Sequence, residues 1–224
     1  MFIDKSMIKN VITIHPEAGI LEAHALMADN RIRHLPVVNG DDRLLGIVTD
    51  RDIRSALPSS LLSPEEIEVE RERISGLRIR DIMTRDMVTI SPYQTLEDAI
   101  LLMQQTKVGA FPVVDLDGKL TGIISIRDLM RAFVNVLGLE EPGALVGIIV
   151  EDKVGQMKKI VDTITEEGVS FGSILVARYW EEGKRAVFPY LLTTNMPRVR
   201  RKLEEAGFTL LNPMEWSLDQ LPKR

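Results

Sequence analysis

The chain has 224 residues, with 28 Lys and Arg against 33 Asp and Glu, 45% hydrophobic residues and no cysteine. No apolar run reaches the roughly 20 residues of a membrane helix and no secretory signal is visible, so we expect a cytoplasmic protein without a membrane partner. The absence of cysteine excludes disulfides, zinc–cysteine sites and thiol catalysis. The net charge of −5 argues against general nucleic-acid binding, and no direct nucleic-acid contact is expected.

The chain contains an internal repeat. Residues 7–53 match residues 83–129 at a constant offset of 76, with 16 identities in 47 aligned pairs. Each copy reads as a short apolar strand, a helix, two strands joined by a turn, and a second helix. A unit of this size closes a core poorly by itself, so the sequence predicts that the two copies pack together as one module.

The first helix of each copy carries apolar residues at helical spacing. In the first copy this stripe is Ile20, Ala23 and Met27, and in the second it is Leu96, Ala99, Ile100 and Met103. His24 aligns with Ile100, which favours an interior histidine over a metal ligand. The three histidines, His15, His24 and His34, have no spacing that indicates a metal centre, so none is expected.

Two further segments flank or join the copies. The charge run after Ser63 predicts a solvated linker helix over 61–76, with a partner-binding acidic face as the alternative. The tail, 214–224, contains Trp216 among apolar residues, so we expect a packing or dimer-contact segment, or a clasp on its own domain.

A break in pattern at Glu140–Gly143 predicts a further domain over 143–213. Its expected elements are a strand over 145–151, a helix over 156–167, strands over 171–179 and 186–194, a helix over 197–206 and a strand over 208–211. That order, βαββαβ, is the split-βαβ ferredoxin-like arrangement. The residues of the first helix that we expect to face the core are Met157, Ile160, Val161 and Ile164.

Each copy of the repeat places a hydroxyl and a carboxylate three residues apart where its last strand meets its second helix. These pairs are Thr49 with Asp52 and Ser125 with Asp128, with Arg51 and Arg127 between them. Both groups lie on one side of the helix start, where a phosphate can accept backbone N–H groups and an ionised Asp can accept a ribose diol. The basic residues could add charge for a phosphate. An ordinary helix cap would satisfy the same N–H groups without a ligand.

These motifs resemble the CBS domain, a family that works as tandem pairs called Bateman modules. The resemblance rests on the apolar-Thr starts, the Pro-Val-Val strands, and the strands from Gly46 and Gly122 that end in a hydroxyl followed by Asp. It covers 1–60 and 77–138, which we take as two CBS domains. The expected fold class is therefore α+β, a tandem CBS pair followed by a ferredoxin-like domain.

The resemblance implies a regulatory ligand of the adenine nucleotide class (AMP, ADP or ATP), with no required cofactor. It implies ribose binding by Asp52 and Asp128 and phosphate binding by Thr49 and Ser125. The residues that it implies for the adenine pocket are Val11, Ile12, Thr13, Met87, Val88, Thr89, Ile47 and Ile123.

The stretch from Arg33 and His34 to Pro36 has the counterpart Gly109, Ala110 and Pro112 in the second copy. In the resembling fold this stretch lines the cleft, so the basic pair would contact phosphate. The cleft with the basic pair would then be the tighter one for a polyphosphate, whereas Gly109 and Ala110 offer backbone and space. The alternative is a surface Arg and a half-buried His.

The turn Asp152–Gln156 resembles the glycine-containing turn of ACT domains, with Val154 where that family usually has Pro. The resemblance implies an effector site, often for amino acids, at Asp152, Val154, Gly155 and Gln156. The alternative is a tight turn that the topology needs. Together with the stretch Asp50–Ser59, this domain further resembles the acetoin-utilisation regulatory protein B type of CBS protein.

The preferred function is a non-catalytic sensor, a homodimer that binds an adenine nucleotide and acts on a protein target that the sequence does not identify. The alternative is an amino-acid-sensing ACT protein in which the CBS pair is a dimerisation scaffold. An enzyme is disfavoured because the polar residues recur symmetrically, as ligand sites do, and no nucleophile–base pair stands out.

Overall fold

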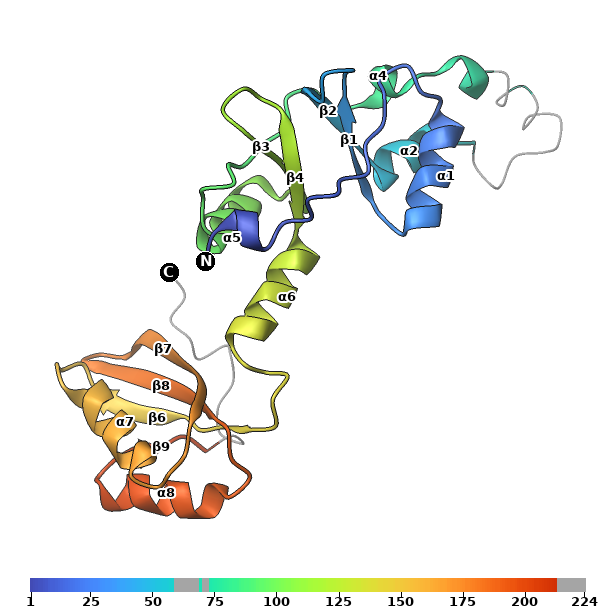
Figure 1. Cartoon of the computed structure of the whole chain (residues 1–224). Helices are drawn as coiled ribbons and strands as arrows, with labels where there is room; N and C mark the ends of the chain where they lie inside the picture. Colours follow the sequence, from blue (N-terminus) through green and yellow to red (C-terminus); the bar gives the residue numbers. More distant parts are fainter. Residues whose placement is uncertain (59–68, 70–72, 213–224) are drawn as a thin grey trace. The chain divides into compact units, whose positions relative to one another are not determined.

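The computed structural model describes residues 1–58, 69 and 73–212 (Figure 1). These residues form two compact units, which meet between Met130 and Arg131 along the chain. The predicted linker helix over 61–76 falls largely outside the described residues, and the tail 214–224 falls wholly outside them.

The first unit contains the two copies of the repeat. Each copy has a helix, an antiparallel hairpin and a second helix, as predicted. In the first copy these are α1 (Ile20–Asn30), β1 (His34–Val38), β2 (Leu44–Thr49) and α2 (Asp50–Ala56), and in the second they are α5 (Leu96–Thr106), β3 (Ala110–Val114), β4 (Leu120–Ser125) and α6 (Ile126–Val136). Two short helices, η1 (Ile3–Lys5) and α4 (Ile79–Ile82), precede the copies.

The two hairpins have the same register. His34 pairs with Thr49 in the first and Ala110 pairs with Ser125 in the second. The initial strand that the sequence predicts in each copy is reduced to a single residue, Ile14 or Ile90, which bridges the hairpin in parallel. The hydroxyl at the end of each last strand therefore lies beside the first residue of the strand before it.

The segment at the start of each copy pairs with the other copy. Ile8 forms an antiparallel bridge with Ile123 of β4, and Thr84 forms the equivalent bridge with Ile47 of β2. Reciprocal backbone hydrogen bonds of 2.9 and 3.0 Å hold each bridge. The buried cluster of the first copy accordingly includes Ile79. Each copy thus completes its core with chain that comes before its partner, which makes the two copies one module.

A glycine in each last strand allows this crossing. A Cβ added at Gly46 would lie 2.8 Å from Sδ of Met83 and 2.9 Å from the Thr84 carbonyl oxygen. A Cβ at Gly122 would overlap Sδ of Met7 in the same way. Both copies of the repeat therefore have glycine at this position because the same close approach of two backbones occurs in each.

The buried face of the first helices is narrower than predicted. Ile20, Ala23 and Met27 are buried, as are their counterparts Leu96, Ala99 and Met103. The prediction is wrong for Ile100, which is 38% exposed, and for His24, which is exposed. Because consecutive helical residues point about 100° apart, the residue after the buried alanine leaves the core side.

The second unit is one antiparallel sheet with two helices. Its elements are β5 (Ala144–Leu145), β6 (Ile148–Glu151), α7 (Gln156–Thr165), β7 (Phe171–Glu181), β8 (Lys184–Leu191), α8 (Met196–Glu205) and β9 (Thr209–Leu210). β5 and β6 pair in one continuous register along β8, so they are the predicted first strand with an interruption at Val146 and Gly147. The order across the sheet is β7-β8-β6-β9.

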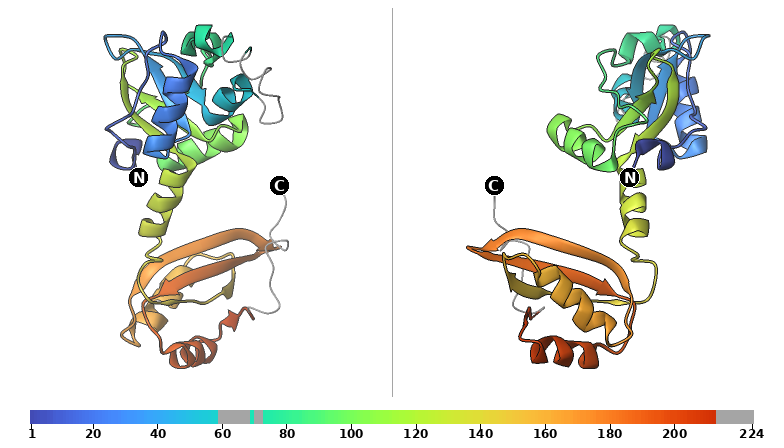
Figure 2. Two further views of the ribbon diagram at one scale, coloured as in Figure 1. Left: turned by 90° about the vertical axis from the view of Figure 1, so that its right-hand side faces the viewer. Right: turned by 60° about the vertical axis from the view of Figure 1, so that its left-hand side comes forward.

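The core of the second unit lies between this sheet and the two helices (Figure 2). It combines Ile160 and Ile164 of α7, Val199 and Leu203 of α8, and Ile148 of β6. Met157, which the sequence predicts as a core residue, is 37% exposed at the start of α7, so that prediction is wrong.

The boundary between the units falls within α6, ahead of the break that the sequence predicts at 140–143. The residues after α6 pack on the second unit. The Tyr190 hydroxyl donates a 2.7 Å hydrogen bond to the Glu141 carbonyl oxygen, and a Cβ at Gly138 would lie 3.2 Å from Gly172.

Replacement of Gly46 by alanine is expected to lower the free energy of unfolding by about 1–3 kcal/mol, since the added methyl group meets a backbone oxygen that cannot move aside. Urea unfolding of Gly46→Ala measures this, with Gly40→Ala as the matched control, because no atom lies within 4 Å of a Cβ added there. Equal stability of the two variants would contradict the close approach.

Candidate functional site

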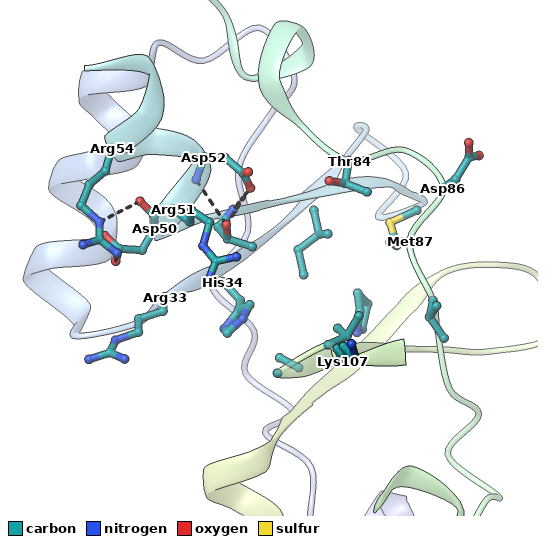
Figure 3. A pocket seen from close by; sticks show the side chains of 17 residues that line it. Arg33, His34, Asp50, Arg51, Asp52, Arg54, Thr84, Asp86, Met87 and Lys107 are labelled. Atoms are coloured by element: carbon teal, nitrogen blue, oxygen red, sulfur yellow. Dashed lines mark hydrogen bonds and ion pairs between the residues drawn. The ribbon is translucent and has the colours of Figure 1, made fainter. Parts of the chain in front are cut away.

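The first unit contains a cavity of about 580 Å³ between the two copies of the repeat (Figure 3). Its walls come from the start of β1, the β2–α2 junction, the segment after α4, and the start of β3. The residues that line it are Arg33, His34, Ile47, Thr49, Asp50, Arg51, Asp52, Arg54, Thr84, Asp86, Met87, Val88, Lys107, Val108, Gly109, Ala110 and Pro112.

The cavity brings together some of the site residues that the sequence predicts, and the others lie outside it. The predicted residues that line it are Arg33, His34, Ile47, Thr49, Arg51, Asp52, Met87, Val88, Gly109, Ala110 and Pro112. Those that do not line it are Val11, Ile12, Thr13, Pro36, Thr89, Ile123, Ser125, Arg127 and Asp128.

The crossing of the chain explains this division. Met87 and Val88 follow Thr84, which pairs with Ile47, so the second copy's first segment lies beside the first copy's hairpin. By the same rule Val11 and its neighbours follow Ile8, which pairs with Ile123 of the second copy. The repeat offset alone does not show which segment pairs with which copy.

The start of β1 and the start of β3 line the same cavity. Nε2 of His34 lies 3.8 Å from the position of a Cβ on Gly109. The prediction that Arg33 and His34 mark one cleft and Gly109 and Ala110 another is therefore wrong, because the two starts face each other across one space. Arg33 is exposed and His34 is half-buried, as the alternative interpretation had it, yet both line the wall.

Sequence reasoning missed six residues of the lining: Asp50, Arg54, Thr84, Asp86, Lys107 and Val108. Asp50 directly follows Thr49, and Arg54 lies four residues after Asp50 on the same face of α2, so helical spacing from Asp50 could have found Arg54. Lys107 belongs to the second copy and gave no such signal, because it reaches the site only through the packing of the two copies.

Thr49 and Asp52 form a reciprocal cap at the start of α2. Oγ1 of Thr49 accepts from the Asp52 N–H at 3.3 Å and donates to Oδ2 of Asp52 at 2.7 Å, while the Thr49 N–H donates to the same Oδ2 at 2.8 Å. Within the described part of the chain, no donor bonds Oδ1 of Asp52. One carboxylate oxygen serves the cap, and the other is available to a ligand in the cavity.

Ser125 and Asp128 repeat this geometry at the start of α6. Oγ of Ser125 donates to Oδ2 of Asp128 at 2.6 Å, and the Ser125 N–H donates to it at 2.9 Å. Asp128 is only 4% exposed, whereas Asp52 is half-buried on the cavity wall. The two equivalent carboxylates thus differ in their access to a ligand.

The cavity wall carries four cations and three carboxylates. Arg54 pairs with Asp50 at 2.7 Å on α2. Arg33, Arg51 and Lys107 form no ion pair with any described residue, so positive charge is left for a ligand.

Burial lowers the pKa of His34 below its ordinary value of 6.5, and the charge of Arg33 lowers it further, while Asp50 and Asp52 act in the opposite direction. At neutral pH the ring is therefore uncharged, with one donor and one acceptor nitrogen facing the cavity region.

Because the unfolded chain takes up a proton at His34 more readily than the folded chain, acidification from about pH 7.5 to about pH 5.5 is expected to lower stability. The loss begins as the pH falls through the unfolded pKa. His34→Gln is expected to reduce this loss, measured as the change in melting temperature, whereas His24→Gln at an exposed site should not. An unchanged acid sensitivity in His34→Gln would contradict the assignment.

The turn before α7 is exposed and lies in the second unit. Gly155 has a φ of +96°, which an L side chain rarely adopts, and it caps α7. Asp152 forms a 2.5 Å ion pair with Arg185, Val154 is fully exposed and Gln156 is half-buried. Gly155 thus has the role that the tight-turn alternative requires.

Within residues 1–58, 69 and 73–212, no group of three His, Cys, Asp or Glu residues is placed to hold a metal ion. No helix in this part of the chain is both long and apolar enough to cross a membrane.

A family model for the CBS domain matches residues 3–59 and 79–135, together just over half of the chain. The chain therefore belongs to the CBS domain family, and the two copies of the repeat are its CBS domains.

Relatives share this pair in different settings. A CBS domain-containing protein from Dictyostelium discoideum is 35% identical over 137 residues, which cover 61% of this chain and 94% of that protein. Inosine-5'-monophosphate dehydrogenase from Methanocaldococcus jannaschii is 34% identical over 128 residues, which cover 57% of this chain and 23% of the enzyme. The chain thus spans less than a quarter of that dehydrogenase.

Solved structures share the fold of the pair. CBSX2, a CBS-pair protein from Arabidopsis thaliana whose structure was determined with AMP, matches with a TM-score of 0.50 at 27% identity, over 59% of this chain and 96% of CBSX2. A Vibrio cholerae protein assigned to acetoin utilization (AcuB) matches with a TM-score of 0.52 at 27% identity, over 63% of this chain and 98% of that protein. Neither match covers the whole chain, so the ACT and acetoin-utilisation resemblances stay predictions.

Proposed function

We propose that this protein is a non-catalytic regulator that binds an adenine nucleotide in the cavity between its CBS domains. The proposal rests on how apolar, acidic and basic side chains are arranged along the wall of that cavity. Figure 3 shows Arg33, His34 and Arg51 gathered on the side of β1 and α2, while Thr84 and Met87 lie at the opposite end. An apolar end, a carboxylate and a cationic end match a base, a ribose and a phosphate.

The apolar end would take the adenine. Ile47, Met87 and Val88 line it, and the methionine can adapt to a flat ring. Because the cavity is about 580 Å³, within the usual range of small-molecule sites, it has room for a nucleotide.

Asp52 would hold the ribose and Thr49 the phosphate. Oδ1 of Asp52 can accept both hydroxyls of a ribose diol while Oδ2 keeps the cap. Arg51, next to Asp52 and without an ion-pair partner among the described residues, would add charge for the phosphate. The cap and the ligand site are compatible, so neither interpretation excludes the other.

Asp52 and Asp128 differ in exposure. We propose that Thr49 and Asp52 bind the nucleotide, while Ser125 and the buried Asp128 act mainly as a helix cap. The AMP complex of CBSX2 supports the ligand class, because that protein has the same pair fold.

A ligand in this cavity would contact both CBS domains at once. Its binding would favour the arrangement of the copies that holds it best, and this is how the signal would pass to a homodimer partner or a protein target in the cytoplasm. The strand order β7-β8-β6-β9 with two helices supports a ferredoxin-like domain of ACT type for the second unit. With the Val136–Gly143 region that precedes it, that domain would supply the link to the target.

Asp52→Asn is expected to weaken AMP binding by about 10- to 100-fold, because it removes the charge from the hydrogen bonds to the ribose. Isothermal titration calorimetry measures this. Asp98→Asn is the matched control, since Thr95 and Asp98 form the same cap at 2.8 Å on α5 away from the cavity.

Asp128→Asn is expected to leave AMP affinity near that of the unaltered protein.

Failure of the intact protein to bind any adenine nucleotide at millimolar concentration would contradict the proposal. Stabilisation by an amino acid alone, lost in Gly155→Val, would favour the ACT-sensing alternative, and sustained ATP hydrolysis abolished by Asp52→Asn would show an enzyme.

A further inference from the structure

Lys107 is the one described cation of the second copy that lines the cavity. It caps α5 with a left-handed φ of 57°, and its N–H donates to the Met103 carbonyl oxygen at 2.9 Å. The chain turns there into Val108 and Gly109, which also line the wall. The backbone under this lysine is therefore fixed by a helix end.

No carboxylate of the described chain pairs with Lys107. Of the other cations on the wall, Arg54 is committed to Asp50, which leaves Arg33 and Arg51 on the first copy. Asp86 lies at the end of the cavity away from these arginines, as Figure 3 shows. The unpaired positive charge is thus supplied from both copies.

One phosphate does not need all of this charge. A monophosphate carries about two negative charges near neutral pH, which Arg51 and the Thr49 hydroxyl on the first copy can meet. Each further phosphate adds about one negative charge and lengthens the ligand within the cavity. Lys107, a flexible four-carbon cation on the facing wall, is suited to meet such an added phosphate.

The repeat itself supplies a comparison. Arg31 holds the position equivalent to Lys107, caps α1 with a φ of 53°, and is exposed, yet it does not line this cavity. The two residues share charge, backbone conformation and helix position, so they differ chiefly in access to the cavity.

We propose that Lys107 is a specificity-determining residue that makes the cavity favour nucleotides with two or three phosphates over AMP, by bridging the outer phosphates to the second CBS domain. The proposal rests on the proposed function, since it assumes that the cavity holds an adenine nucleotide. The outer phosphates of ADP or ATP would thus add a contact to the second copy, at Lys107, that the single phosphate of AMP lacks.

The experiment is calorimetric titration of the full chain with AMP, ADP and ATP in the presence of a metal chelator. The salt concentration is kept low, because salt screens the charge of an exposed cation. Intact protein is expected to bind ATP about 10-fold more tightly than AMP. Lys107→Gln is expected to lose most of that preference while AMP affinity changes less than about twofold. Arg31→Gln, the matched control, is expected to keep it.

Equal affinities of the intact protein for AMP and ATP would overturn this inference and leave the proposed function in place. A preference for ATP that persists in Lys107→Gln, or that Arg31→Gln reduces equally, would also overturn it, since the effect would then be absent or due to net charge alone. Absence of binding by any of the three nucleotides would overturn the proposed function itself. Melting curves of both variants identify a loss that comes from misfolding.

Discussion

The organisation of the first unit depends on one antiparallel contact that is used twice. The segment near the start of each CBS domain pairs with the last strand of the other, at Ile8 with Ile123 and at Thr84 with Ile47. Gly46 and Gly122 permit the contact because a side chain at either position would meet a methionine. Ile79, from the chain that leads into the second copy, is part of the buried core of the first, so the core of one copy is completed by its partner.

The same contact creates the candidate site. By bringing Met87 and Val88 beside Ile47, the crossing gives the cavity an apolar wall from one domain and a polar wall of Thr49 and Asp52 from the other. The cavity is a property of the pair, and a ligand in it would sense the relation between the two domains. That is the physical basis of the regulatory role that we propose.

The sequence predicted well what depends on local pattern. The repeat, the hairpins and the element order of the second unit follow from periodicity. The caps at Thr49 and Ser125 follow from capping chemistry, which the sequence offered as the alternative to a ligand site. It did not predict what depends on packing between copies. Matching residues in a repeat do not show which copy each segment packs against. For that reason Arg33 and Gly109 were assigned to different clefts, and Lys107 was not predicted to line the cavity. The similar motifs around Asp52 and Asp128 gave no sign that the two carboxylates differ in exposure.

A crystal structure of the full chain grown with AMP would show where the nucleotide binds. We predict electron density for one nucleotide in this cavity, with its adenine between Ile47 and Val88, its ribose hydroxyls on Oδ1 of Asp52 and its phosphate at Thr49 and Arg51. A nucleotide bound only at Ser125 and Asp128, or a cavity that stays empty at saturating AMP, would contradict it.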